Sequence, residues 1–146
     1  MTVGNSGDVT NDSYNKAIIA CNENDGSWTY QPSDCWIYLL YSAGAKATGR
    51  RLIKMVGGSA TTVFSIPGPG DQASWCMRII QDVSEPTDKI RALDGADADS
   101  LVEQGTADDT ANSGAANIWT GMMTEMKTTG SVGTMTIDDF EVVTPQ

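Results

Sequence analysis

The stretch GSVGTMTIDDFEVV, Gly130 to Val143, decides the expected fold. Its apolar residues keep a period of two as far as Ile137 and reappear one position out of phase at Phe140. Side chains of a strand alternate between two faces, so a one-residue phase change indicates a face switch or a bulge. We therefore expect a closing β-strand that is bulged at Asp138 and Asp139, the two carboxylates at the phase change.

The composition favours a single all-β domain. The chain has 146 residues, of which 40% are hydrophobic and 19% charged, and this length is typical of one domain with one core. Thr, Ser, Gly, Asn and Asp are abundant, as expected for short strands joined by many turns. The longest apolar run is strand-sized and far below the ~18 residues of a membrane span, so we expect no membrane association.

Four segments outline the expected strand order. Residues 1–14 are polar and rich in Gly, Asn and Asp, which predicts an extended N-terminal arm before a domain over 15–146. The run Cys35 to Tyr41 is apolar on both faces, so it should lie in the middle of a sheet with cover on each side. Arg50–Val56 and Thr61–Ile66 predict a hairpin, because Gly57-Gly58 suits a two-residue turn.

The second half is more polar. Ser74–Gln81 and Asp88–Leu93 predict two further short strands, and the acidic stretch 94–114 predicts a long loop. Ala115–Lys127 fits an amphipathic helix and also a strand; Gly121 and the two Thr residues are weak helix formers, so we favour a strand.

About eight short strands with regular turn signals predict a β-sandwich or jelly roll. The ending GTMTIDDFEVV resembles the last strand of concanavalin-like and carbohydrate-binding jelly rolls, a kind of fold that also serves in bacteriophage virion decoration proteins. The resemblance covers only the last fourteen or so residues, and it implies a jelly-roll-like sandwich.

The net charge of −10 is unevenly distributed. Residues 1–70 carry five acidic and five basic side chains, a balance of zero, whereas residues 71–146 carry fourteen acidic and four basic ones. Such a surface repels phosphate backbones, so we expect no direct nucleic-acid binding. It favours basic protein partners or divalent cations, or it keeps the chain in solution.

Catalysis is not expected. The chain has no His, which excludes the usual Ser-His and Cys-His nucleophiles. Asp138 and Asp139 are adjacent on a strand and should point to opposite faces, so they cannot flank one sugar bond. The three cysteines, Cys21, Cys35 and Cys76, are expected as buried thiols of a protein made in a reducing cytosol, with one disulfide and a spare thiol as the alternative.

Two groups of carboxylates are candidate calcium ligands. The stretch DGADAD places Asp94, Asp97 and Asp99 within six residues, although its spacing departs from that of an EF-hand. By the resemblance alone, Asp138 or Asp139 would hold a structural calcium ion. The alternative is that these two are bulge carboxylates that accept backbone N–H bonds.

Aromatic platforms are the candidate carbohydrate site. A sugar face stacks on an exposed ring, and most aromatic residues of this chain lie within apolar runs that predict burial. Trp28 follows the turn NENDGS and Trp119 follows the acidic stretch, so these two are the candidates for exposed platforms.

Two functional hypotheses follow. The N-terminus has neither a basic nor an apolar signal region, which favours a structural virion protein, made in the host cytoplasm, that decorates a bacteriophage capsid. Its partners would be capsid proteins or other copies of itself. The alternative is an extracellular carbohydrate-binding module with an aromatic platform and a structural calcium ion.

Overall fold

The computed structural model describes residues 2–6, 13–21, 33–43, 46–70, 75–82, 88–109, 119–126 and 134–138, and among them the side chains of 33–40, 49–68, 76–82 and 88–109. In these segments the chain forms ten β-strands and one short 3-10 helix, η1 (Ala98–Ser100). The expectation of an all-β chain is confirmed.

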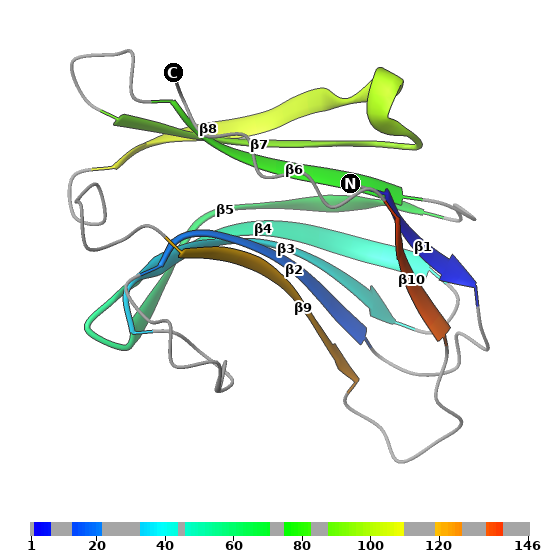
Figure 1. Ribbon diagram of the computed structural model, residues 1–146, viewed down its shortest axis with the longest axis horizontal. Coiled ribbons are helices and arrows are strands. Elements are labelled where there is room, and N and C mark those ends of the chain that lie inside the picture. Colours follow the sequence, from blue (N-terminus) through cyan, green and yellow to red (C-terminus); the bar gives the residue numbers. More distant parts are fainter. Residues whose placement is uncertain are drawn as a thin grey trace.

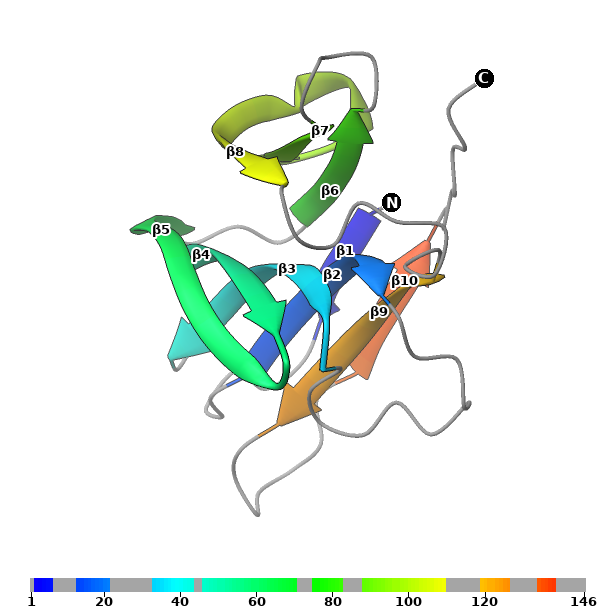
Figure 2. The same ribbon diagram turned by 90° about the vertical axis from the view of Figure 1, so that its left-hand side faces the viewer.

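The strands form two five-stranded antiparallel sheets (Figure 1). Sheet A has the order β10-β1-β6-β7-β8 and sheet B the order β5-β4-β3-β2-β9. Figure 2 shows β6, β7 and β8 as a layer above β3, β4 and β5. The strands of sheet A are β1 (Thr2–Ser6), β6 (Trp75–Asp82), β7 (Asp88–Gly95), β8 (Val102–Asp109) and β10 (Thr134–Asp138), and those of sheet B are β2 (Ser13–Cys21), β3 (Cys35–Ala43), β4 (Lys46–Val56), β5 (Ser59–Gly70) and β9 (Trp119–Met126).

β3 is the central strand of sheet B and is buried on both faces, as its sequence predicts. Its alternate residues Trp36, Tyr38 and Leu40 join a core cluster that includes Met77 of β6 and Ile90 of β7, so this cluster connects the two sheets. The intervening residues of β3 belong to a second cluster on the opposite face of sheet B. Burying a large apolar side chain contributes roughly 1.5–3 kcal/mol, so β3 anchors the fold.

The hairpin predicted across Gly57-Gly58 is confirmed. Val56 pairs with Ser59, and the two glycines have φ angles of 54° and 78°. Two consecutive positive φ angles define a type I′ turn, whose twist matches that of the flanking strands. The N–H of Gly58 donates to the Ser33 carbonyl at 2.8 Å, so the turn is fastened to the segment that enters β3.

The predicted closing strand is present as β10, at the edge of sheet A. It pairs in unbroken register with β1, from Thr2 opposite Asp138 to Ser6 opposite Thr134. The predicted bulge at Asp138 and Asp139 lies at the limit of the described residues.

The sequence predicts that segment 1–14 is an arm outside the packed domain. For Thr2–Ser6 the structure shows a strand of the sheet instead. Thr2–Ser6 forms β1, which lies inside sheet A between β10 and β6. Ladder hydrogen bonds use the backbone alone, so a mostly polar sequence with a single apolar residue, Val3, can still be held in a sheet.

The expectation of a loop over 94–114 is wrong for 94–109, the part of it that the structure describes. Asp94 and Gly95 end β7, η1 makes the turn, and β8 then pairs antiparallel with β7. β8 lacks a strand-like apolar pattern because it is an edge strand, where charged side chains face water and discourage further pairing. For Ala115–Lys127 the strand prediction is confirmed over Trp119–Met126, which forms β9.

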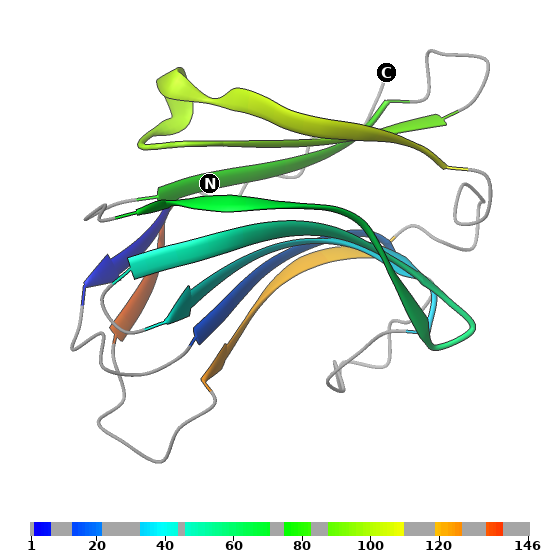
Figure 3. The same cartoon turned by 180° about the vertical axis from the view of Figure 1, so that it is seen from behind.

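The edge strands β5 and β8 each contain a bulge near the middle of the strand, and β5 has a second irregularity between Pro67 and Gly70. Thr62 and Phe64 face the consecutive residues Ile53 and Leu52 of β4, so Val63 is the extra residue of β5. In β8, Gln104 is extra, because Glu103 and Gly105 face consecutive residues of β7. Bulges re-aim the side chains beside them. Both strands are at the sheet edges that Figure 3 turns toward the viewer.

Gly105 illustrates a close approach between the two sheets. A Cβ atom at Gly105 would lie 2.7 Å from Cδ1 of Phe64 and still closer to Cε1. The Phe64 ring also lies against Tyr38, with the two ring centroids 6.3 Å apart. Phe64 of sheet B therefore packs directly on the backbone of β8 in sheet A, and only glycine leaves room for the ring.

We predict that Gly105→Ala lowers the free energy of unfolding by about 1–3 kcal/mol, the usual cost of overpacking. Urea denaturation of a double-mutant cycle with Phe64→Leu checks the cause, because the smaller side chain vacates the space that the new methyl group needs. The loss caused by Gly105→Ala should shrink in the Phe64→Leu background. Additive effects would contradict the contact.

Candidate functional site: a charged clamp between the sheets

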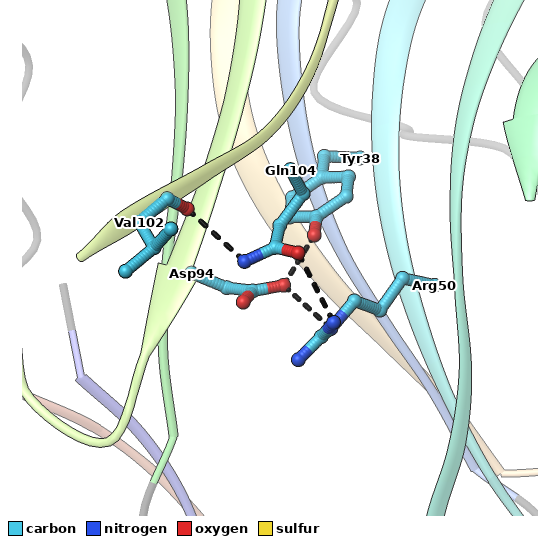
Figure 4. Close-up of polar contacts among 5 residues, drawn as sticks. All are labelled: Tyr38, Arg50, Asp94, Val102 and Gln104. Carbon is cyan, nitrogen blue, oxygen red and sulfur yellow. Dashed lines mark hydrogen bonds and ion pairs between the residues drawn. The ribbon is translucent and has the colours of Figure 1, made fainter. Parts of the chain in front are cut away.

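Four polar side chains meet between the two sheets (Figure 4). We call Tyr38, Arg50, Asp94 and Gln104 the inter-sheet clamp. Tyr38 and Arg50 come from β3 and β4 of sheet B, whereas Asp94 and Gln104 come from β7 and β8 of sheet A.

Asp94 is the centre of the clamp, and only 1% of its surface is exposed. Its position follows from the alternation of β7, where Ile90 and Ala92 belong to the core on the same side of the strand. The Tyr38 hydroxyl donates a hydrogen bond to Asp94 Oδ2, and Arg50 Nε lies 2.8 Å from the same oxygen. Side chains of β3 and β4 in sheet B therefore reach the same carboxylate of sheet A.

Gln104 completes the clamp because the bulge in β8 brings it there. Its Oε1 accepts a hydrogen bond from Arg50 Nη1 at 3.1 Å, and its Nε2 donates to the carbonyl oxygen of Val102 at 3.2 Å. The partly buried Arg50 therefore has an ion pair with Asp94 of β7 and a hydrogen bond to Gln104 of β8, two neighbouring strands of sheet A.

The local electrostatics fix the protonation of Tyr38. Burial and the neighbouring Asp94 raise the pKa of the Tyr38 hydroxyl far above its ordinary value. Burial also raises the pKa of Asp94, while Tyr38, Arg50 and Gln104 act in the opposite direction. The tyrosine therefore remains a neutral donor, and the clamp is suited to holding the sheets together rather than to nucleophilic chemistry.

The three candidate calcium ligands of the acidic stretch do not converge. Asp94 points into the clamp, whereas Asp97 caps η1 by accepting hydrogen bonds from the N–H groups of Asp99 and Ser100. Asp99 is exposed. Within the described residues, no group of three or more acidic or Cys side chains is arranged to hold a metal ion.

The other candidates fall outside the described side chains. Asp138 and Trp119 belong to β10 and β9, but only their backbones are described; Trp28 and Asp139 lie wholly outside the described residues. Cys35 and Cys76 are both buried thiols, and the side chain of Cys21 is not described. No helix in the described segments is long and apolar enough to cross a bilayer.

The outer face of sheet A carries a second set of charges. Lys89 of β7 pairs with Asp108 of β8 at 2.5 Å, and Arg91 pairs with Glu103 at 2.7 Å. Hydrogen bonds from Thr106 and Arg91 lower the pKa of Glu103. These exposed cross-strand pairs tie the acidic edge strand to its neighbour.

Comparison with known proteins identifies no relative: no known family, no curated protein and no solved structure matches this chain.

We predict that Asp94→Ala lowers the free energy of unfolding by about 3–5 kcal/mol, because it removes the carboxylate that both accepts the Tyr38 hydrogen bond and pairs with Arg50. Asp108→Ala is the matched control: the carboxylate of Asp108 is 58% exposed and also pairs with a basic residue. It should cost no more than about 1 kcal/mol. Equal losses in urea denaturation would contradict the clamp.

A second prediction concerns pH. A carboxyl group whose pKa is higher in the folded state binds protons preferentially there, so its contribution to stability is full below the unfolded pKa of about 3.9 and is lost as pH rises through the folded pKa. The pKa of Asp94 is raised in this way. We expect the stability of the wild type, minus that of Asp94→Asn, to grow on acidification from neutral pH. A difference that shrinks instead would mean that Arg50 dominates and holds the pKa down.

Proposed function

We propose that this chain is a non-catalytic structural protein of a virus particle, a bacteriophage capsid-decorating or virion-surface protein that docks through protein–protein contacts. The observation that carries the proposal is the inter-sheet clamp. Its buried carboxylate is bound by Tyr38 and Arg50, so the buried charge serves the fold, and the edges and charged faces are left for function.

The strand order supports the jelly-roll-like sandwich that belongs to this proposal. β1 pairs with β10, and β2 pairs with β9. The first two strands therefore pair with the last two in reverse order, as expected when a long hairpin is rolled into two sheets. Jelly rolls of this type serve in viral capsid and lectin domains, but a fold does not fix a function.

The distribution of charge supports a protein partner. Asp97 and Asp99 beside η1 are exposed, as are Glu103 and Asp108 of β8. An acidic surface of this kind attracts a basic patch on a partner and accelerates docking. It disfavours nucleic acid, whose phosphates it repels.

The test is the protein content of purified particles. Particles from cells in which the genome encoding this chain replicates are banded on a density gradient, washed and analysed by quantitative mass spectrometry. We expect the chain in a fixed ratio to the major shell protein. Its absence from washed particles would overturn the proposal, and binding to a glycan array would favour the carbohydrate-binding alternative.

A further inference from the structure

β5 is an exposed sheet edge without charge. It is the outermost strand of sheet B and pairs with β4 alone among the described strands. It is 12 residues long, and no charged residue occurs between Lys54 and Asp71. The side chains of residues 59–63 are all exposed, including Val63 at 41%.

Such an edge is unusual, because folded proteins normally protect their outer strands. Alternate residues of an antiparallel strand direct their N–H and C=O groups away from the neighbour, so an open edge is a template for another strand. Pro67 and Pro69 protect the end of β5, because a proline has no N–H group to donate to another strand. From Ser59 to Ile66 there is neither a proline nor a charge, and Thr, Val, Phe and Ile favour strand pairing.

The edge of sheet A offers the contrast. β8 carries Glu103, Asp108 and Asp109, and the first two form cross-strand pairs with Arg91 and Lys89. Two copies that met along β8 would place like charges about 5 Å apart, which is unfavourable. The chain therefore protects one edge with charges and leaves the other neutral.

We propose that β5 pairs antiparallel with β5 of a second copy across a two-fold axis, which joins the two B sheets into one continuous sheet. An antiparallel strand edge is complementary to itself, as an isologous interface requires. The neutral half of each chain then lies at the interface, and the acidic halves are kept apart.

The basic residues of β4 do not oppose this arrangement. Arg50, Arg51 and Lys54 lie one strand inward, so the two β4 strands of a dimer are separated by three strand spacings, about 14 Å. This exceeds the Debye length of about 8 Å at physiological ionic strength, and the repulsion is screened.

The expected register follows from the unprotected stretch. A two-fold axis perpendicular to the sheet sets one residue opposite its own equivalent, and Thr62 is the midpoint of Ser59–Ser65, so an axis beside Thr62 lets these seven residues of each copy pair. Val63 is the extra residue of the bulge. Its side chain, exposed in the single copy, would lie next to the axis, opposite Thr61 of the second copy.

Sedimentation equilibrium of the full chain over a wide range of concentration tests the proposal, which does not depend on the proposed function. We expect a monomer–dimer equilibrium. Thr62→Lys and Val63→Lys each place like charges beside the axis, and each should raise the dissociation constant of the dimer by about fivefold or more. Val102→Lys is the matched control, because Val102 is 61% exposed on the opposite edge strand, and it should leave the dimer unchanged.

A wild type that stays monomeric would overturn the proposal, as would dimers insensitive to both β5 variants or sensitive to Val102→Lys. A monomer that is still found in particles would overturn the dimer and leave the proposed function standing. A dimer that is absent from particles would support the dimer and overturn the proposed function.

A cysteine scan tests the register. Ser59, Thr62 and Ser65 are exposed, and each is replaced singly by cysteine and treated with a mild oxidant. A two-fold antiparallel pair brings equivalent residues together only near its axis, so Thr62→Cys should cross-link far more than the other two. Equal cross-linking at all three positions would indicate parallel stacking into fibrils and would overturn the closed dimer.

Discussion

The buried carboxylate of Asp94 is the constraint on which the described structure depends. Removing a charge from water costs several kcal/mol unless the protein supplies compensating partners. Here the partners are Tyr38 and Arg50, which reach Asp94 from the other sheet. If the two sheets slid past one another here, the carboxylate of Asp94 would stay buried and lose its contacts with Tyr38 and Arg50. The clamp therefore fixes how the two sheets sit against one another at this point.

The same requirement accounts for the irregular edge strands. The bulge in β8 brings Gln104 to Arg50, and the bulge in β5 precedes Phe64, which packs on Gly105 of β8. Regular strands would alternate past these positions and leave one partner of each contact facing water. The irregularities are therefore local adjustments by which the two sheets make polar and apolar contacts along one side.

The sequence predicts the elements whose signal is local. The two-sided apolar run of β3 and the Gly57-Gly58 turn carry their own physical reasons, and both are found. β8 was missed because an exposed edge strand needs no apolar period. Tyr38 and Arg50 were missed because their role depends on a partner 56 or 44 residues away in sequence. The spacing of Asp94 with Asp97 and Asp99 predicts a metal ligand. Its alternation with Ile90 and Ala92 is the signal that predicts burial, and the structure follows the alternation.

A purely apolar interior would serve stability as well as this clamp or better, because buried ion pairs seldom gain more than they cost to desolvate. Their attested use is to specify one arrangement. A slip of β7 by one residue would turn Asp94 to the outer face and carry Lys89 and Arg91 toward the core. That arrangement would bury cations away from the carboxylate of Asp94, which costs much more free energy than the loss of an apolar contact. In a chain with many Thr, Ser and Gly residues, whose strands carry weak register signals, the buried Asp94 specifies the register of β7 against sheet B.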